Sequence, residues 1–574
     1  SGVSFNSVGS SQITINWAAG NGSNRLVLVK AVSQVDSDPV DGISYTANTT
    51  FGNGSQIGSG NYVVYNGVGN SVTITGLSAN TTYYVAVYEF NGFGGSQNYL
   101  TTNPAVGSQL TLPTPVDFTG TGLLGRPTNH SITLNVVAAN TALDAYVKYG
   151  TTSGVYIDST TIVSKAANDP IEIVIDELSA NTKYYYRFVY SSDGGSNWLE
   201  RDEHTFHTQR PPGSSFTFTI TSDSHLGQYG GVTSDELALY TLTLQNAAQD
   251  NPDFHLDLGD TFPMDPLSPY GNGLGNGMTE ENADAAYALQ RAYLDQVCHS
   301  IPFFYVPGNH ENEEGWNWDD DSHFMYPERS LAIVGIKARK KYIPNPIPDD
   351  FYTGNDDPLP PEFLADYPDT PPEENFREDY YAWTWGDALF VVIDPLQYSM
   401  TWPNESGNNG YGGEGQDGEA SGERWDWTLG IKQYLWLKST LESSNAAYKF
   451  VFTHHVTGGE TSYGRGGIDA APYFEWGGKN ADGTWGWDAH RPASEGWDVP
   501  IHQLMVENGV NIFFHGHDHI YSHEELDGIV YLECAKPDDT GYTWEPYGYG
   551  ETEDLYPNGL NIPNSGYMRV NVSP

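Results

Sequence analysis

The chain has 574 residues, which is too long for a single hydrophobic core, so we expect about two to four domains. It holds 73 Asp and Glu residues against 25 Lys and Arg residues. The formal charge of −48 repels phosphate backbones and anionic membranes, which argues against nucleic acid as the main partner. No apolar run approaches the roughly 20 residues that cross a bilayer, so we expect no membrane span.

The N-terminal part of the chain repeats itself. Leu77-Ser-Ala-Asn-Thr-Thr-Tyr-Tyr returns as Leu178-Ser-Ala-Asn-Thr-Lys-Tyr-Tyr, and each copy leads from a turn into a strand that begins with a Tyr pair. An earlier strand in each repeat alternates apolar and polar residues, as a half-buried strand does. Its apolar positions are Ile13, Ile15 and Trp17 in the first repeat and Ile132, Leu134 and Val136 in the second. The repeats therefore predict two β-sandwiches. The turn before each Tyr pair resembles the tyrosine-corner region of fibronectin type III domains.

Proline-rich junctions bound the two repeats. They are Leu112-Pro-Thr-Pro115 and Gln209-Arg-Pro-Pro-Gly213, where no strand can continue. We therefore expect one sandwich over residues 1–113, a second over 114–212, and a further domain over 213–574.

After residue 213 the pattern changes to apolar strands separated by helical segments. A helix is predicted from Thr233, which has capping-box spacing to Glu236. Others are predicted from Thr279 to about Cys298 and over 429–441, and a last strand over Tyr567–Val572. Strands alternating with helices predict an α/β layered core.

Five short polar motifs each follow an apolar run of this domain that is typical of a buried strand. The runs are Phe216–Ile220, Phe254–Leu258, Phe303–Val306, Phe450–Phe452 and Ile512–Phe514. The motifs are Asp223-Ser-His225, Gly259-Asp260, Gly308-Asn309-His310-Glu311, Thr453-His454-His455 and Gly516-His517-Asp518-His519. Open α/β sheets bind ligands beyond their carboxyl-terminal strand ends, so we expect these side chains to gather at one edge. Carboxylate, imidazole and amide oxygen together suit a pair of divalent cations.

In this order the motifs resemble those of the calcineurin-like metallophosphoesterase superfamily, which includes the purple acid phosphatases. Purple acid phosphatases also place a β-sandwich before the catalytic domain. The resemblance implies a layered αββα core and two divalent transition-metal ions drawn from Mn, Zn and Fe. It implies that one ion is held by Asp223, His225 and His519, that the other is held by Asn309, His454 and His517, and that Asp260 bridges them.

The resemblance also implies catalytic roles for Asp260 and His310. His310 matches the histidine that binds the phosphoryl oxygens or protonates the leaving alcohol, while Glu311 would orient it or simply end the motif. Either His454 or His455 fits the spacing of a ligand, and the family pattern favours His454. His515 and His523 flank the last motif and are interpreted as structural.

Two departures separate the chain from purple acid phosphatases. That family has Gly where this chain has His225, and a ligating Tyr where this chain has Pro263. The chain instead resembles the wider Asp-x-His branch, whose members use Mn, Zn or Fe(II). Many of those relatives place an Asp at the position of Pro263 to support the catalytic histidine, and Asp265 is the candidate substitute here.

Three further features bear on the site. Residues 319–379 are rich in Pro, Asp and Glu, which predicts a long insertion acting as a lid or specificity wall. Within it, Lys337–Lys341 form a basic cluster that either pairs with nearby carboxylates or contacts a substrate phosphate. Loops at 402–427 and 458–490 are predicted to surround the same cleft.

The chain has two cysteines. Cys298 and Cys534 are either buried thiols or one bridge.

The leading hypothesis is a secreted phosphomonoesterase that hydrolyses small organic phosphate esters through hydroxide shared by the two ions. The first alternative is a phosphodiesterase that uses the same site. The second is an adhesion or glycan-binding protein with an inert phosphatase-like domain. Export to the medium, periplasm or cell surface is inferred from the domain types, and the oligomeric state stays open.

Overall fold

The computed structural model describes residues 2–226, 233–262, 279–311, 313–315, 331–359, 376–399, 424–457, 465–538, 556–562 and 565–574. The chain divides into two compact units. The first comprises Ser1–Asp117 with Asn140–Asp144 and Tyr190–Leu199, and the second comprises the remainder. Among the described residues no helix has the length and apolar character needed to span a bilayer.

The first unit is an all-β sandwich. One sheet has the order β1 (Val3–Asn6), β2 (Gln12–Trp17) and β6 (Ser71–Thr75). The other has the order β4 (Gln56–Ile57), β5 (Asn61–Gly67), β3 (Asn24–Ala31), β7 (Thr82–Asn91) and β8 (Asn98–Tyr99), with β9 (Ala105–Leu110) also on β7. The predicted apolar positions Ile13, Ile15 and Trp17 are buried in the core between these sheets.

A second sandwich follows and belongs to the second unit. One sheet contains β10 (Asp117–Phe118), β12 (Ile132–Ala139), β11 (Leu123–Gly125) and β16 (Pro170–Ile175). The other contains β14 (Asp158–Ser159), β13 (Leu143–Gly150), β17 (Lys183–Ser191), β18 (Leu199–Glu200), β15 (Val163–Lys165) and β19 (His204–His207). The prediction of two N-terminal β-sandwiches is therefore confirmed.

Each repeat contains the same backbone hydrogen bond to a tyrosine. The N–H of Ser78 donates to the hydroxyl of Tyr83 at 2.8 Å, and the N–H of Ser179 donates to the hydroxyl of Tyr184 at 2.8 Å. This bond holds the turn against the strand that follows it, as in a tyrosine corner. The likeness to fibronectin type III domains stays a prediction.

Two sheets packed face to face form the centre of the C-terminal domain. The smaller has the order β22 (Phe303–Tyr305), β21 (Phe254–Asp257), β20 (Phe216–Thr221) and β31 (Met568–Val572). The larger has the order β23 (Thr353–Gly354), β24 (Tyr381–Trp385), β25 (Ala388–Val392), β26 (Tyr448–Phe452), β27 (Ile512–His515), β29 (Ile529–Glu533), β28 (Tyr521–Leu526) and β30 (Leu560–Ile562). Aromatic side chains from both sheets share one core; for example, the ring centroids of Phe218 and Phe390 lie 5.2 Å apart.

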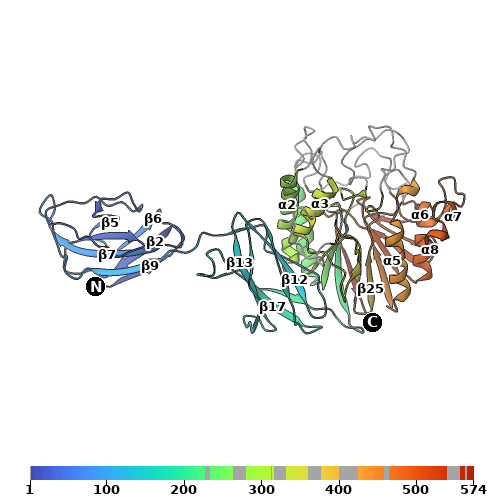
Figure 1. Cartoon of the computed structure of the whole chain (residues 1–574), viewed down its shortest axis with the longest axis horizontal. Helices are drawn as coiled ribbons and strands as arrows, with labels where there is room; N and C mark the ends of the chain where they lie inside the picture. The colour runs from blue at the N-terminus through green and yellow to red at the C-terminus, as the bar shows by residue number, and fades with distance from the viewer. Residues whose placement is uncertain are drawn as a thin grey trace. The chain divides into compact units, whose positions relative to one another are not determined.

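Helices cover the outer face of each sheet, so the layered αββα core is confirmed (Figure 1). The smaller sheet is covered by α1 (Ser234–Gln249), α2 (Glu280–Cys298) and α3 (Leu331–Tyr342). The larger sheet is covered by α5 (Gly430–Ser443), α6 (Phe474–Gly477), α7 (Trp487–His490) and α8 (Ile501–Glu507). The predicted capping box is present, since Thr233 accepts from the N–H of Glu236 and the Glu236 carboxylate accepts from the N–H of Thr233.

The described part of the insertion, predicted as a lid or specificity wall, contains a helix packed into the domain. Helix α3 lies within it and buries Val334, Ala338 and Tyr342 against α2 and the smaller sheet. The sequence did not predict this helix because its apolar residues lie on more than one face and show no helical periodicity. Its cations also lie inside the domain, where apolar residues would be expected. Residues 316–330 and 360–375 lie outside the described residues.

The basic cluster on α3 pairs with carboxylates. Arg339 is buried and forms two bonds with the carboxylate of Glu313, at 2.7 and 2.9 Å. The other three cations pair as Lys337 with Glu280, Lys340 with Glu378 and Lys341 with Asp284. The first alternative for this cluster is therefore correct, although Arg339 is buried rather than solvated. The two cysteines, Cys298 and Cys534, are both buried and free, which settles the choice between thiols and a bridge.

Polar contacts join the second sandwich to the C-terminal domain. Arg291 of α2 donates through Nη1 to the Asn135 side-chain oxygen of β12 and to the Tyr342 carbonyl, both at 2.6 Å. Asp295 on the same helix accepts from the N–H groups of Thr121 and Gly122. Because these groups are shielded from water, their loss leaves unpaired polar atoms in the interface.

Replacing Arg291 tests how strongly this interface stabilises the domain. Arg291→Met should lower the free energy of unfolding by about 3 kcal/mol, since it removes the buried donor to the Asn135 side chain and to the Asn135 and Tyr342 carbonyl groups. Arg569→Met removes an arginine that is 53% exposed and should change stability by less than about 0.5 kcal/mol. Urea unfolding followed by tryptophan fluorescence measures both. Equal small effects would show that the interface contributes little.

Candidate metal centre

The five motifs meet at the carboxyl-terminal ends of parallel strands. Strands β20, β21 and β22 are mutually parallel, and so are β25, β26, β27 and β29. The loops after β20, β21, β22, β26 and β27 carry the candidate ligands. Three groups of these side chains have metal-binding spacing. Two share no residue and are called the two clusters below: Asp223, His225 and His519, and Asp260, His454 and His517. The third joins His225, Asp260 and His310 across them. The sequence prediction of convergence at one edge is thus matched by the fold.

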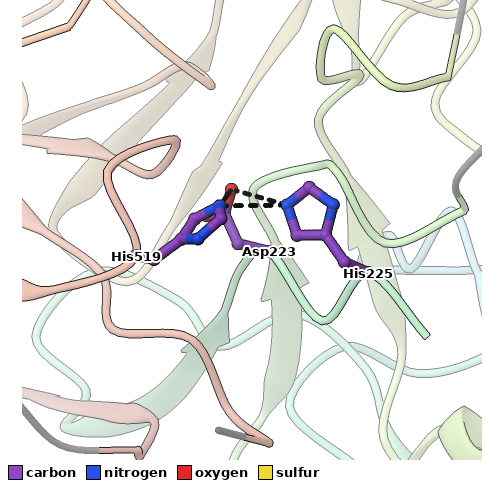
Figure 2. Close-up of side chains that lie close together, drawn as sticks. All are labelled: Asp223, His225 and His519. Atoms are coloured by element: carbon purple, nitrogen blue, oxygen red, sulfur yellow. Dashed lines mark hydrogen bonds and ion pairs between the residues drawn. The ribbon is translucent and has the colours of Figure 1, made fainter. Parts of the chain in front are cut away.

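The first cluster joins two loops that are far apart in the sequence (Figure 2). Asp223 Oδ1 lies 3.6 Å from His225 Nε2 and 3.5 Å from His519 Nε2. The two imidazole nitrogens lie 3.0 Å from each other. Figure 2 shows the three polar ends directed toward one another, so these side chains enclose a common point.

The second cluster is arranged around Asp260. Its Oδ2 atom lies 3.0 Å from His454 Nε2 and 4.0 Å from His517 Nδ1, and those two nitrogens are 3.2 Å apart. The same Oδ2 atom is 3.6 Å from His225 Nε2, which belongs to the first cluster. Asp260 therefore lies between the two clusters, where a bridging ligand would have to lie.

The donor set fits divalent transition metals. Ligand atoms about 2.1 Å from a cation are separated by about 3.0 to 3.5 Å from one another, close to the spacings within both clusters. His454 Nδ1 lies 2.8 Å from the Leu258 carbonyl oxygen, which directs Nε2 into the site and fixes the ring. Asn309 Oδ1 is buried, and no described residue forms a hydrogen bond with it. A cation is one partner that would satisfy this oxygen.

The charges of the site favour cation binding. Burial alone raises the pKa of Asp223 and Asp260, but the facing histidines outweigh it and hold both pKa values well below the usual range. Burial lowers the pKa of His225 to about 3, so its ring is neutral as a ligand must be. Burial also lowers the pKa of His454, yet the charges of Asp260 and Asp223 raise it to about 9. The two carboxylates thus favour positive charge at this point of the site.

Backbone strain is concentrated at these ligands. Positive φ angles occur at Asp223 (61°), His225 (46°), Asp260 (53°), His517 (82°) and His519 (63°). This left-handed region costs a residue with a side chain about 1 kcal/mol or more, and it persists only where the surroundings impose it. The glycines next to the ligands meet two needs. Gly259 itself has a φ of 98°, whereas a Cβ at Gly516 would lie 2.1 Å from Ser222 Oγ, so that position demands close approach of two loops.

Glu311 holds the loop that carries Asp260. Its buried carboxylate accepts hydrogen bonds from four backbone N–H groups, those of Gly308, Asp260, Thr261 and Phe262. This role differs from both roles considered from the sequence, because Glu311 ties the Gly-Asp motif to the Gly-Asn-His-Glu motif. The spacing of the motif gave no sign of it, since the contact crosses about fifty positions of the chain.

The last motif is supported through Asp518, which the sequence prediction passed over. Its carboxylate accepts from Arg465 Nη1 at 2.6 Å, from the Tyr556 hydroxyl at 2.6 Å and from the N–H of Gly466 at 2.9 Å. Its own N–H donates to Glu533 at 2.9 Å. The position of Asp518 between two ligand histidines was the available signal, whereas Arg465 and Tyr556 carry no motif.

The remaining histidines occupy distinct places. His455 is in neither cluster: its Nδ1 lies 3.0 Å from the Val456 carbonyl oxygen and its ring stacks on Trp427 at 5.0 Å. His515 is buried with Nδ1 2.6 Å from Glu533, and His523 lies on β28 outside both clusters. His310 Nε2 lies 3.8 Å from Asp260 Oδ2, and its side chain is 20% exposed, more than the neighbouring histidine ligands. Pro263 and Asp265 lie outside the described residues.

Comparison with known proteins identifies the domain. The model of the calcineurin-like phosphoesterase family matches residues 216–521. No curated protein matches the chain. The solved structure of PhoD shares the fold, with 18% identity over 79% of this chain and 84% of that chain and a TM-score of 0.52.

Two other solved structures match with low TM-scores. GAP50, the anchor in the inner membrane complex of Plasmodium, has 13% identity over 62% of this chain and 81% of its own, with a TM-score of 0.28. The segment of two fibronectin type III domains from chicken tenascin has 14% identity over 36% of this chain and 97% of its own, with a TM-score of 0.21. Neither carries weight for the fold or the site.

A matched pair of substitutions tests the choice between adjacent histidines. His454→Asn removes an imidazole that faces Asp260, so it should weaken cation binding by at least about 100-fold and leave purified protein short of one equivalent or more. His455→Asn should retain the metal content of the unchanged protein. Elemental analysis after dialysis measures both, with circular dichroism to check folding. Metal loss confined to the His455 variant would reverse the assignment.

Proposed function

Because the chain belongs to the calcineurin-like phosphoesterase family, we propose that it is a secreted phosphomonoesterase that hydrolyses small organic phosphate esters. The family assignment makes it a metal-dependent phosphoester hydrolase. The observation that supports the proposal best is the position of Asp260 Oδ2, within 4.0 Å of imidazole nitrogens from both clusters. An inert domain would have no need to maintain five strained ligand positions.

The proposed ligand sets follow the two clusters. Asp223, His225 and His519 would hold one cation, Asn309, His454 and His517 would hold the other, and Asp260 would face both. Mn, Zn and Fe(II) all accept such mixtures of imidazole and oxygen ligands. Two cations here would offset the charge of a phosphoryl group and lower the pKa of a water molecule.

His310 is the proposed proton donor. Its Nε2 lies at the edge of the site, 3.8 Å from Asp260 Oδ2, and its backbone N–H donates to Asp260 Oδ1 at 2.8 Å. When water attacks phosphorus and the ester P–O bond breaks, the leaving oxygen must gain a proton. His310 in its protonated form can give that proton or hold a phosphoryl oxygen by a hydrogen bond.

The other parts of the proposal concern the domains. We propose boundaries at 1–113, 114–212 and 213–574, with the two sandwiches as spacers or binding modules. The paired bonds from Ser78 to Tyr83 and from Ser179 to Tyr184 support fibronectin type III-like folds for both. Secretion, to the medium, periplasm or cell surface, is proposed from these domain types.

Paired model substrates test the reaction. The metal-loaded protein should hydrolyse p-nitrophenyl phosphate with a kcat/KM at least about tenfold above that for bis-p-nitrophenyl phosphate, and Asp260→Asn should lower the monoester value at least about 100-fold. Initial rates of p-nitrophenol release measure both.

Each outcome bears on a different alternative. A preference for the diester would make the phosphodiesterase alternative the correct one. Failure of the metal-loaded protein to hydrolyse either ester would favour the adhesion protein with an inert domain.

A further inference from the structure

Arg465 is fixed beside the candidate metal centre, yet half of its guanidinium is unused. Its Nη1 atom donates to Asp518 Oδ1 at 2.6 Å and to the His517 carbonyl oxygen at 3.1 Å. Both bonds use the same nitrogen. They hold the planar group against the backbone of a candidate ligand, so its position is set by the turn that carries His517.

The opposite edge of this guanidinium makes no hydrogen bond to any described residue. Nε is buried and has no hydrogen-bond partner among the described residues, and none of them accepts from Nη2. A buried N–H left unpaired costs about 1 to 3 kcal/mol. Nε–H and one Nη2–H lie parallel on this edge and form the fork that binds two oxygens of a phosphate or carboxylate.

The position of this fork suits a phosphoryl group. Arg465 contacts the main chain of His517, whose ring faces Asp260, and its side chain is 22% exposed. The cations of α3 that a phosphate might otherwise contact are each paired with a carboxylate. Asp518 accepts from Tyr556 and Gly466 as well as from Arg465, so it is supported without the whole guanidinium.

We propose that Arg465 binds non-bridging oxygens of the substrate phosphoryl group through its Nε–Nη2 edge and thereby favours monoesters over diesters. This inference rests on the proposed function. A monoester has one more non-bridging oxygen than a diester and at neutral pH carries more negative charge. If each of two bound cations took one non-bridging oxygen, a monoester would keep a third for the fork and a diester would keep none, and a fixed guanidinium would stabilise the charge on that oxygen.

The test uses Arg465→Gln in the full chain loaded with Mn²⁺. We expect kcat/KM for p-nitrophenyl phosphate to fall about 100-fold and that for bis-p-nitrophenyl phosphate to fall less than about tenfold. Binding of inorganic phosphate, measured by isothermal titration calorimetry, should weaken about tenfold. Metal content should remain that of the unchanged protein. Arg569→Gln, which removes an exposed arginine, is the control for loss of one positive charge.

Other results would overturn the inference. Loss of metal in Arg465→Gln, with equal loss of both activities, would show that Arg465 only positions His517. Tyr556→Phe removes a different donor to Asp518 without changing charge, and an equally selective loss there would assign the effect to Asp518. Unchanged phosphate binding would also refute the contact. If the unchanged protein hydrolyses neither ester, the proposed function fails, whereas activity that is indifferent to Arg465 overturns this inference alone.

Discussion

Two buried carboxylates, Asp223 and Asp260, are the constraint around which the catalytic domain is organised. Both have almost no exposure to solvent, and transferring such charges from water costs several kcal/mol each unless opposite charge or hydrogen bonds compensate. The surrounding imidazoles compensate in part, which is why the pKa values of both carboxyls stay low. Divalent cations would offset the desolvation cost of the two carboxylates more fully than the imidazoles do. The buried negative charge that opposes folding therefore also favours metal binding.

The fold meets this constraint with rigid supports. Strands from two sheets end at the same edge, and the sheets are locked by an aromatic core that includes Phe218, Phe390 and Phe452. Above this core, Glu311 holds the loop of Asp260 by hydrogen bonds to its backbone. A hydrogen bond from Asp518 to Glu533 holds the turn of His517 and His519. These contacts hold ligands in left-handed backbone conformations that an isolated loop would leave. Strain and support together preorganise the site.

The sequence allowed prediction of those features that depend on short-range pattern. Apolar runs located the strands, and the polar motifs after them located the side chains that gather in the two clusters, because parallel strands bring their ends together. Helix α1 was predictable from the Thr233 and Glu236 capping box, which is formed by neighbouring residues. The segment predicted as a lid or specificity wall contains the packed helix α3, which its sequence pattern did not predict. Helix α3 hides its cations in ion pairs with distant residues such as Glu313, and no local pattern reveals such partners.

The site residues that the sequence did not predict, like the cations of α3, act through partners that are distant in the sequence. Arg465, Tyr556 and Glu533 reach Asp518 from three separate segments of the chain, and Glu311 reaches the loop of Asp260 across another. Each is an ordinary residue in sequence and gains its role only through the fold. The repeated tyrosine turn alone does not establish that the sandwiches are fibronectin type III domains. It also does not reveal the role of the N-terminal sandwich.

The central claim is that the five loops form one centre for two cations. Anomalous diffraction from crystals of the Mn²⁺-loaded protein, collected at the metal absorption edge, tests it most directly. The account predicts two anomalous peaks, one among Asp223, His225, Asp260 and His519 and one among Asp260, Asn309, His454 and His517. A single peak, or peaks away from Asp260, would contradict it.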